Sequence, residues 1–309
     1  MSELASVNGR LLPIAEACVP IEDRGFLLGD GLFETVRVAN GKPFRFAQHL
    51  ERMARGADFL KIKCPFTPDA LRRFAGELIG KNRMPEAILR LTLTRGPGGR
   101  GYTPKADANP TLVMTLHAAP GAPSTGPAGC ENVSGQPESA LGAPLQWNLI
   151  TSTFRIPAGD PLAAFKTTSK ILHVLARAEA VEQGADEALL LNTNGEAAET
   201  ASGNLFWVQD DTICTAPAVG ILPGITRAVV LEICRTLGIR TNQRAIRPDE
   251  LKHRAGIFIT QSALGIVPVL MIDGRPVAPS SLVDQIARAY HEMTKCWFNH
   301  ELTLVNYLH

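Results

Sequence analysis

Hydrophobic and polar positions in the first part of the chain follow strand-like and helix-like patterns in turn. The stretch GLFETVRVANGKPFRF reads as two strands joined by a turn at Asn40 and Gly41, which is a hairpin signal. Helical spacing follows in AQHLERMARGADFLKI and DALRRFAGELIGKN, and two apolar runs predict core strands, AILRLTLTRG and PTLVMTLHA. Residues 1–117 are therefore predicted to form an N-terminal α/β domain.

The pattern changes at residues 118–144, which are dense in Pro, Gly, Ser and Ala. Such a segment buries too little apolar surface to order itself strongly, so we interpret it as an interdomain linker. Beyond it, strand-like runs such as LQWNLITSTF, DEALLLN and GNLFWVQDDTICTA alternate with helical ones. The sequence predicts an α/β (α+β) protein of two domains, with residues 145–309 as the second.

Composition excludes several classes of function. The 309 residues are 45% hydrophobic, enough for a buried core, and the net charge of +1 argues against a nucleic-acid surface. No window approaches the apolar length of a membrane span, and Glu16 interrupts the apolar start LLPIAEACVP, which makes it a poor secretory signal. The six cysteines are scattered, so we expect a cytoplasmic chain without a metal site.

Three segments carry groups that favour an anion. A Pro-Gly turn in GILPGITRAVV delivers Ile225 and Thr226 to the first turn of a predicted helix, where unpaired N–H groups attract negative charge. An ordinary capped helix has the same pattern, so both interpretations stay open. Ser262 in ITQSALG offers a further hydroxyl or a cap, and Arg52 in HLERM is a phosphate ligand or a solvated helix residue.

Lysines and a carboxylate add reactive chemistry. Lys166 and Lys170 lie at the predicted mouth of a helix in AAFKTTSKILHVLARAEAVEQ, and Glu199 lies between a turn and a strand in GEAAETASGNLFWV. A buried lysine amine forms a Schiff base with a carbonyl cofactor, and a buried carboxylate keeps a pyridine nitrogen protonated. An exposed carboxylate is the alternative for Glu199. An amine, a carboxylate and a phosphate-binding helix start together suggest a pyridoxal 5′-phosphate site.

These segments, from IEDRGFLLGDGLFETVRV to ITQSALGIVPV, span residues 21–269 and resemble the class IV (fold type IV) pyridoxal-phosphate enzymes. That family includes branched-chain aminotransferases, D-amino-acid aminotransferases and 4-amino-4-deoxychorismate lyases. The resemblance implies Lys166 as the Schiff-base lysine and Glu199 as the partner of the pyridine nitrogen. It also implies a set of phosphate contacts: Arg52, Ile225, Thr226 and Ser262. Lys170 would lie one helical turn on, as a solvated lysine.

The resemblance further implies an architecture like that of D-amino-acid aminotransferase, with two α/β domains and the cofactor between them. It implies a homodimer whose partner loops close the site, and a small-molecule amino substrate. A non-catalytic binding protein that keeps this fold is an alternative of another class. The joint presence of Lys166, Glu199 and Arg52 argues against it, because none of the three is needed for folding.

The stretch RGPGGRGY decides which member of the family the chain resembles most. It is similar to a run in the lyases, and Arg100 takes the position where D-specific aminotransferases hold a substrate carboxylate. Tyr102 stands where those enzymes have histidine, and Phe33 replaces a tyrosine. We therefore expect a 4-amino-4-deoxychorismate lyase that releases pyruvate and 4-aminobenzoate for folate biosynthesis, although Ser169 departs from the lyase pattern. The alternative is a transaminase of D- or branched-chain amino acids with a 2-oxoacid acceptor.

Overall fold

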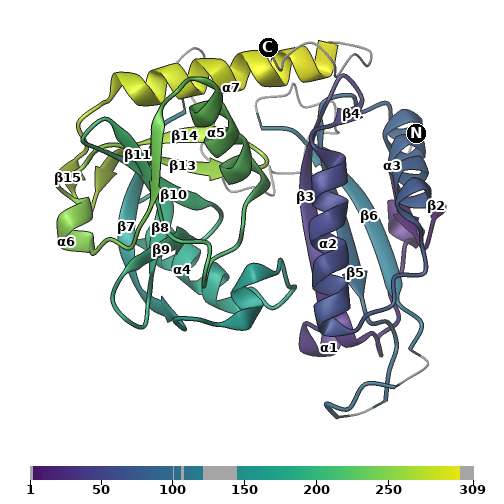
Figure 1. The fold of residues 1–309 in the computed structure, drawn as a ribbon. Helices are drawn as coiled ribbons and strands as arrows, with labels where there is room; N and C mark the ends of the chain where they lie inside the picture. The colour runs from purple at the N-terminus through teal and green to yellow at the C-terminus, as the bar shows by residue number, and fades with distance from the viewer. Residues whose placement is uncertain (1–2, 100, 106–107, 121–144, 300–309) are drawn as a thin grey trace.

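The computed structural model describes residues 3–99, 101–105, 108–120 and 145–299, and it builds two β-sheets that lie beside each other (Figure 1). The first sheet is antiparallel, in the order β2-β1-β6-β5-β3-β4. Its strands are β1 (Leu4–Val7), β2 (Arg10–Pro13), β3 (Gly31–Ala39), β4 (Lys42–Pro43), β5 (Ala87–Thr94) and β6 (Thr111–Ala118). The short helices η1 (Ile14–Glu16) and α1 (Arg24–Leu28) precede β3.

One face of this sheet is apolar because every second residue of its strands is. Leu32 and Val36 of β3 pack in one buried cluster with residues of the helices α2 (Phe46–Leu60) and α3 (Pro68–Asn82). Successive strand residues point to opposite faces, so Phe33 and Thr35 face the other side of the sheet. The predicted hairpin is confirmed, since Asn40 and Gly41 join β3 to β4 with positive φ angles of 48° and 73°.

The second sheet has nine strands in the order β12-β11-β10-β13-β14-β7-β8-β9, with β15 paired to β14. It is mixed, and β7 (Trp147–Ile156) runs parallel to both of its neighbours, β8 (Glu187–Asn192) and β14 (Gly265–Ile272). The other strands are β9 (Ala197–Thr200), β10 (Asn204–Gln209), β11 (Thr212–Thr215), β12 (Arg240–Gln243), β13 (Ala255–Gln261) and β15 (Arg275–Pro276). The helices of this half are η2 (Pro161–Ala164), α4 (Ile171–Glu182), α5 (Ile225–Thr236), α6 (Pro248–Leu251) and α7 (Ser281–Asn299).

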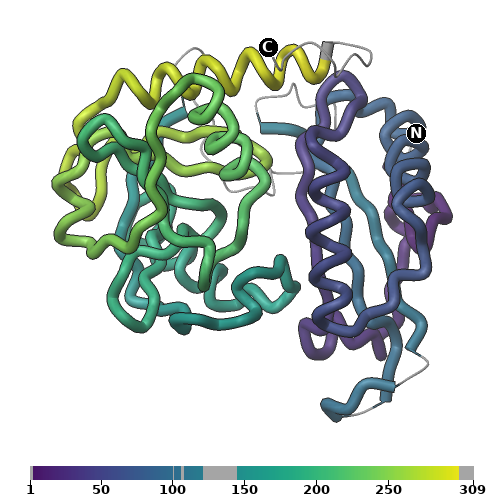
Figure 2. Tube along the Cα trace, in the orientation of Figure 1, coloured from purple at the N-terminus to yellow at the C-terminus, as the bar shows by residue number. Residues whose placement is uncertain are grey.

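Contacts at both ends of the interface join the halves. Helix α7 extends from the second half toward the first, as the tube of Figure 2 also shows, and Phe44 after β4 lies edge-on to Trp297 with ring centroids 5.4 Å apart. At the other contact, residues 166–168 lie along β3. The amide of Phe33 donates to the carbonyl of Lys166 at 2.8 Å, and the amide of Thr168 donates to the carbonyl of Gly31 at 2.9 Å.

The predicted mixed α/β fold is confirmed, and the structure builds it from two sheets. The first sheet ends at Ala118 and the second begins at Trp147, whereas residues 121–144 of the predicted linker lie outside the described residues. The domain limits at 117 and 145 therefore stay a proposal. None of the helices within the described ranges combines the length and apolar character needed to cross a membrane.

Candidate active site

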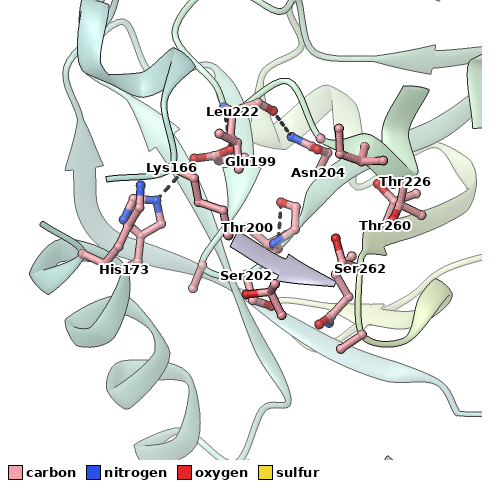
Figure 3. A pocket seen from close by; sticks show the side chains of 18 of the residues that line it. Lys166, His173, Glu199, Thr200, Ser202, Asn204, Leu222, Thr226, Thr260 and Ser262 are labelled. Carbon is pink, nitrogen blue, oxygen red and sulfur yellow. Dashed lines mark hydrogen bonds and ion pairs between the residues drawn. The ribbon is translucent and has the colours of Figure 1, made fainter. Parts of the chain in front are cut away.

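A cavity of about 460 Å³ lies between the polar face of the first sheet and the second half of the chain. Strand β3 contributes to one wall, and the segment before α4, the turn after β9, the start of α5 and the turn after β13 form the others. Figure 3 shows the side chains that the second half of the chain contributes, among them Lys166, Glu199 and Thr226. The cavity brings together seven residues singled out from the sequence: Phe33, Arg52, Lys166, Glu199, Ile225, Thr226 and Ser262.

Lys166 lies in an extended segment rather than at the mouth of a helix. The prediction that it enters a helix is wrong, because α4 begins only at Ile171. The backbone around Lys166 is hydrogen-bonded to β3, and Thr167 forms a bridge with Leu32. β-Branched residues suit such an extended conformation. Pairing with a distant strand therefore overrides the local helical pattern.

The Lys166 amine has a lowered pKa and lies against an aromatic ring. Its Nζ lies 4.4 Å from the centroid of the Phe33 ring. Burial lowers the pKa of Lys166 to about 8, and the nearby Arg52 charge lowers it further, whereas Glu34 and Glu199 oppose the shift. A lysine with this pKa supplies a neutral amine within about one pH unit of neutrality.

Glu199 is buried inside β9, with 7% of its surface exposed. The alternative of an exposed carboxylate is therefore wrong. Its Oε2 accepts a hydrogen bond from the amide of Leu222 at 3.1 Å, and its Oε1 lies 3.3 Å from Nε2 of His173. The Nδ1 atom of His173 is buried without a partner in the described part of the chain. Sequence reasoning missed His173, for which the only available signal was its place one helical turn after Lys170.

The start of α5 forms the opposite end of the cavity. Gly224 is the N-cap and no side chain caps the helix, so the first-turn N–H groups near Ile225 and Thr226 stay available to a ligand. A Cβ at Gly224 would collide with Oδ1 of Asn204, which explains the glycine. Arg52 reaches the same place, because its Nη1 donates to the carbonyl of Pro223 at 3.1 Å. Ser262 adds a hydroxyl from the turn after β13.

Behind Arg52 lies a buried ion cluster that sequence reasoning missed. Glu34 accepts from Nε and Nη2 of Arg52 at 2.8 and 2.7 Å, and it lies 2.7 Å from Nδ1 of His49. Burial alone would raise the pKa of Glu34, but the hydrogen bonds from Arg52 and His49 outweigh it and lower this pKa to about 2. A signal was present, since Glu34 falls on the apolar face of β3 and buried carboxylates need cationic partners. Arg52 is thus held rigidly and is not a solvated helix residue.

Lys170 is the N-cap residue of α4 and lines the cavity. Burial lowers its pKa, although Glu199 and Asp160 favour its charged form. The prediction of a solvated helix lysine is therefore wrong. No hydrogen bond or ion pair within the described residues reaches its amine.

The predicted substrate contacts are Phe33, Arg100 and Tyr102. Phe33 lines the cavity, Arg100 lies outside the described residues, and the structure does not bring Tyr102 to this cavity, since it is 88% exposed. The guanidinium of Arg90, which we did not anticipate, lies 4.1 Å from the centroid of the Phe33 ring. Burial lowers its pKa, and no carboxylate of the described chain pairs with it.

Comparison with known proteins gives consistent matches. The family model for amino-transferase class IV matches residues 31–272. The chain is 30% identical to D-alanine aminotransferase of Bacillus licheniformis, over 91% of this chain and 94% of that protein. It is similar to the structure of a T.th. branched-chain amino acid aminotransferase with pyridoxamine 5′-phosphate, with 27% identity, 94% of both chains covered and a TM-score of 0.83. The 4-amino-4-deoxychorismate lyase from Pseudomonas aeruginosa matches with 28% identity and a TM-score of 0.78, over 94% of this chain and 98% of that one.

Proposed function

This chain belongs to the class IV aminotransferase family, whose members use pyridoxal 5′-phosphate, and from that membership we propose that it is a transaminase. It would move the amino group of a D- or branched-chain amino acid to a 2-oxoacid. The observation that carries the proposal is the lysine amine with a lowered pKa, Lys166, in one cavity with the buried carboxylate of Glu199. Perturbed ionisable groups that share a cavity are typical of active sites.

The chemistry of the cavity walls fits the cofactor group by group. Lys166 offers an amine for its aldehyde, and Glu199 offers a carboxylate for its ring nitrogen. The uncapped start of α5, with Arg52 beside it, offers N–H groups and a positive charge for its phosphate. Thr226 and Ser262 would add hydroxyl groups there. When bound, pyridoxal 5′-phosphate supplies a carbonyl that captures an amine and a ring that withdraws electrons.

Lys166 and Glu199 would then have separate roles in the reaction. Nζ of Lys166, as a neutral amine, would take the proton from the α-carbon of the amino acid and deliver it to the carbonyl carbon of the cofactor, on the other side of the amino nitrogen. Glu199 would accept the N–H of the pyridine ring and hold its positive charge. Its two oxygens already meet the amide of Leu222 and the imidazole of His173, so this carboxylate is fixed in place.

Arg90 supports an amino-acid substrate. Every such substrate carries a carboxylate, and a guanidinium binds a carboxylate through two parallel hydrogen bonds. Arg90 and Nζ of Lys166 lie 4.1 and 4.4 Å from the centroid of the same ring, that of Phe33, so a carboxylate bound by Arg90 would lie beside the Phe33 wall of the cavity. We propose Arg90 and Phe33 as substrate contacts, and Arg100 and Tyr102 as further contacts from the resemblance.

The lyase expected from the sequence is the second candidate. The stretch RGPGGRGY and the similarity to the lyase from Pseudomonas aeruginosa favour it. It would share the first proton removal by Lys166, after which the substrate would lose its enolpyruvyl group as pyruvate and leave 4-aminobenzoate. The two reactions differ in where the proton on Nζ goes next.

We also propose that the protein is a cytoplasmic homodimer. Its cysteines within the described ranges are all free, which suits a reducing compartment. Large apolar side chains are exposed on α1 and α4, including Phe26 (73%) and Ile171 (70%). Such side chains suit a surface that a second copy covers.

A paired assay tests the function. Purified protein with pyridoxal 5′-phosphate is offered a panel of D- and L-amino acids with a 2-oxoacid, and separately 4-amino-4-deoxychorismate. Transamination without 4-aminobenzoate release supports the proposal, and the reverse result establishes the lyase. The protein would be a non-catalytic binding protein if both activities are absent and no visible absorption band is lost on borohydride reduction.

A further inference from the structure

The cavity contains a second amine for which the proposed reaction has no use. Lys170 lines it from the N-cap of α4, and its amine has no hydrogen bond or ion pair within the described residues. Lys170 is half-buried, and a partly desolvated cation without a partner is stabilised when a ligand supplies one. The carboxylate of Glu199 attracts it but lies beyond ion-pair distance. Lys170 is therefore placed to meet an anionic group of something bound in the cavity.

The neighbours of Lys170 on α4 are already engaged. Arg177 lies 3.3 Å from the carboxylate of Glu187, and His173 lies 3.3 Å from Glu199. Val174 is the other residue of this helix in the cavity wall and is apolar. Lys170 is thus the one group on this side of the cavity, among the described residues, whose charge is uncompensated.

The chemistry of the cofactor tells which of its edges faces α4. In pyridoxal 5′-phosphate the aldehyde lies opposite the ring nitrogen, and the hydroxyl and the phosphate arm occupy the two edges between them. With the aldehyde at Lys166 and the nitrogen at Glu199, the phosphate arm would be held at the start of α5. Figure 3 shows Thr226 of α5 on one side of Lys166 and Glu199, and His173 of α4 on the other. In that position the ring hydroxyl would lie on the side of α4.

We propose that Lys170 is the cationic partner of the ring hydroxyl of the cofactor. The inference rests on the proposed function, because it takes the cofactor position from Lys166, Glu199 and α5. Lys170 would stabilise the ionised hydroxyl next to the reacting carbonyl. The two amines in FKTTSKIL then have separate tasks, one at the aldehyde and one at the oxygen beside it.

The test varies both the side chain at position 170 and the ligand, and it measures the dissociation constant of each pair. Apo-enzyme of wild type, Lys170→Met and Lys170→Arg is titrated with pyridoxal 5′-phosphate and with the analogue that lacks the ring hydroxyl, 3-deoxypyridoxal 5′-phosphate. For pyridoxal 5′-phosphate, Lys170→Met should raise the dissociation constant by about tenfold to hundredfold, the value of a charge-assisted hydrogen bond, and Lys170→Arg by less. For the analogue, wild type and Lys170→Met should bind alike. The exposed Lys81, changed to Met, is the matched control and should bind as wild type does.

Equal losses for both ligands would overturn the proposal, because Lys170 would then act on the phosphate or on the fold. Unchanged binding of pyridoxal 5′-phosphate by Lys170→Met would overturn it as well. The melting temperature of each apo-enzyme checks folding, and Lys170→Gln replaces the Met variant if that one does not fold. Mass spectrometry after borohydride reduction separates the two proposals. A wild-type adduct on Lys166 upholds the cofactor position, an adduct on Lys170 overturns the present inference, and no adduct overturns the proposed function itself.

Discussion

Consecutive residues of β3 face two groups of buried charges that are built differently. On one side, Glu34 is paired with both Arg52 and His49. On the other side, Phe33 lies against the cations of Lys166 and Arg90, for which the described residues supply no carboxylate within ion-pair distance. The paired charges hold the turn of α2 that contains His49 and Arg52 to β3, whereas cations without an ion-pair partner are available to a ligand. The pattern of pairing thus distinguishes a structural cluster from a binding one.

The strongest test of this contrast is Lys166→Ala. We expect turnover to fall by roughly 10³-fold or more, because the group that moves the proton is lost. The free energy of unfolding should not fall, since the variant removes a desolvated amine that has no ion-pair partner within the described residues. Steady-state kinetics and denaturant unfolding measure the two quantities, with Lys81→Ala as the control. A large loss of stability would show that Lys166 stabilises the fold, as the Glu34 cluster does.

Glu34→Gln should have the opposite effect to Lys166→Ala and reduce the stability of the fold. Removing the carboxylate leaves Arg52 and His49 without their anion, so the free energy of unfolding should fall by about 3–5 kcal/mol. The pKa of Glu34 is about 2 in the folded chain and 4.5 as its ordinary value, so its contribution is present above pH 4.5. This contribution is lost as the pH falls toward 2.

Urea unfolding of wild type and Glu34→Gln at several pH values measures this dependence. The two proteins should converge in stability at low pH. The exposed Glu77, which lies 3.9 Å from Arg73, provides a control whose change to Gln should cost less than about 1 kcal/mol. A Glu34→Gln protein as stable as wild type at neutral pH would contradict the structural assignment of this cluster.

Arg52→Ala tests the one side chain that belongs to both groups. It pairs with Glu34 and also lines the cavity beside Pro223. Its loss should weaken cofactor binding by about 1.5–3 kcal/mol, the value of a hydrogen bond to a charged group. Titration of apo-enzyme with pyridoxal 5′-phosphate gives the dissociation constant, and Arg52→Lys should recover part of the loss. An unchanged dissociation constant would show that Arg52 does not contribute to cofactor binding.

His173→Phe should give the smallest effect. The imidazole contributes one hydrogen bond to Glu199, whose other oxygen keeps its bond from the amide of Leu222. A single bond of this kind is worth about 0.5–1.5 kcal/mol, so kcat should fall by roughly tenfold or less with little change in KM. The kcat of His173→Gln, which keeps a hydrogen-bond donor, should fall less than the kcat of the Phe variant. Equal losses in both variants would argue that His173 acts through packing.

Sequence patterns predicted the residues of this site better than their surroundings. Lys166, Glu199, Thr226 and Arg52 do line one cavity, as the resemblance to the class IV enzymes implied. Their chemical roles stay predictions. Glu34 was missed because a carboxylate in an alternating strand reveals its burial only when the faces of the sheet are known.

The helix predicted around Lys166 failed for a different reason. Its residues have good helical spacing, but the backbone of residues 166–168 pairs with β3, far away along the chain. Periodicity in a short window contains no information about such a partner. The same error hid Lys170, since its burial follows from a cavity that only the two halves together enclose.

The pairing of residues 166–168 with β3 also affects how the protein avoids aggregation. The strand order leaves the side of β3 at Gly31–Phe33 without a strand of its own sheet, apart from β5 on the other side. An uncovered strand edge is a template for pairing with another chain, and the segment of Lys166 covers this one. The segment that contains the proposed catalytic lysine therefore also shields the sheet. A substitution that detaches this segment would expose a self-associating edge as well as abolish catalysis.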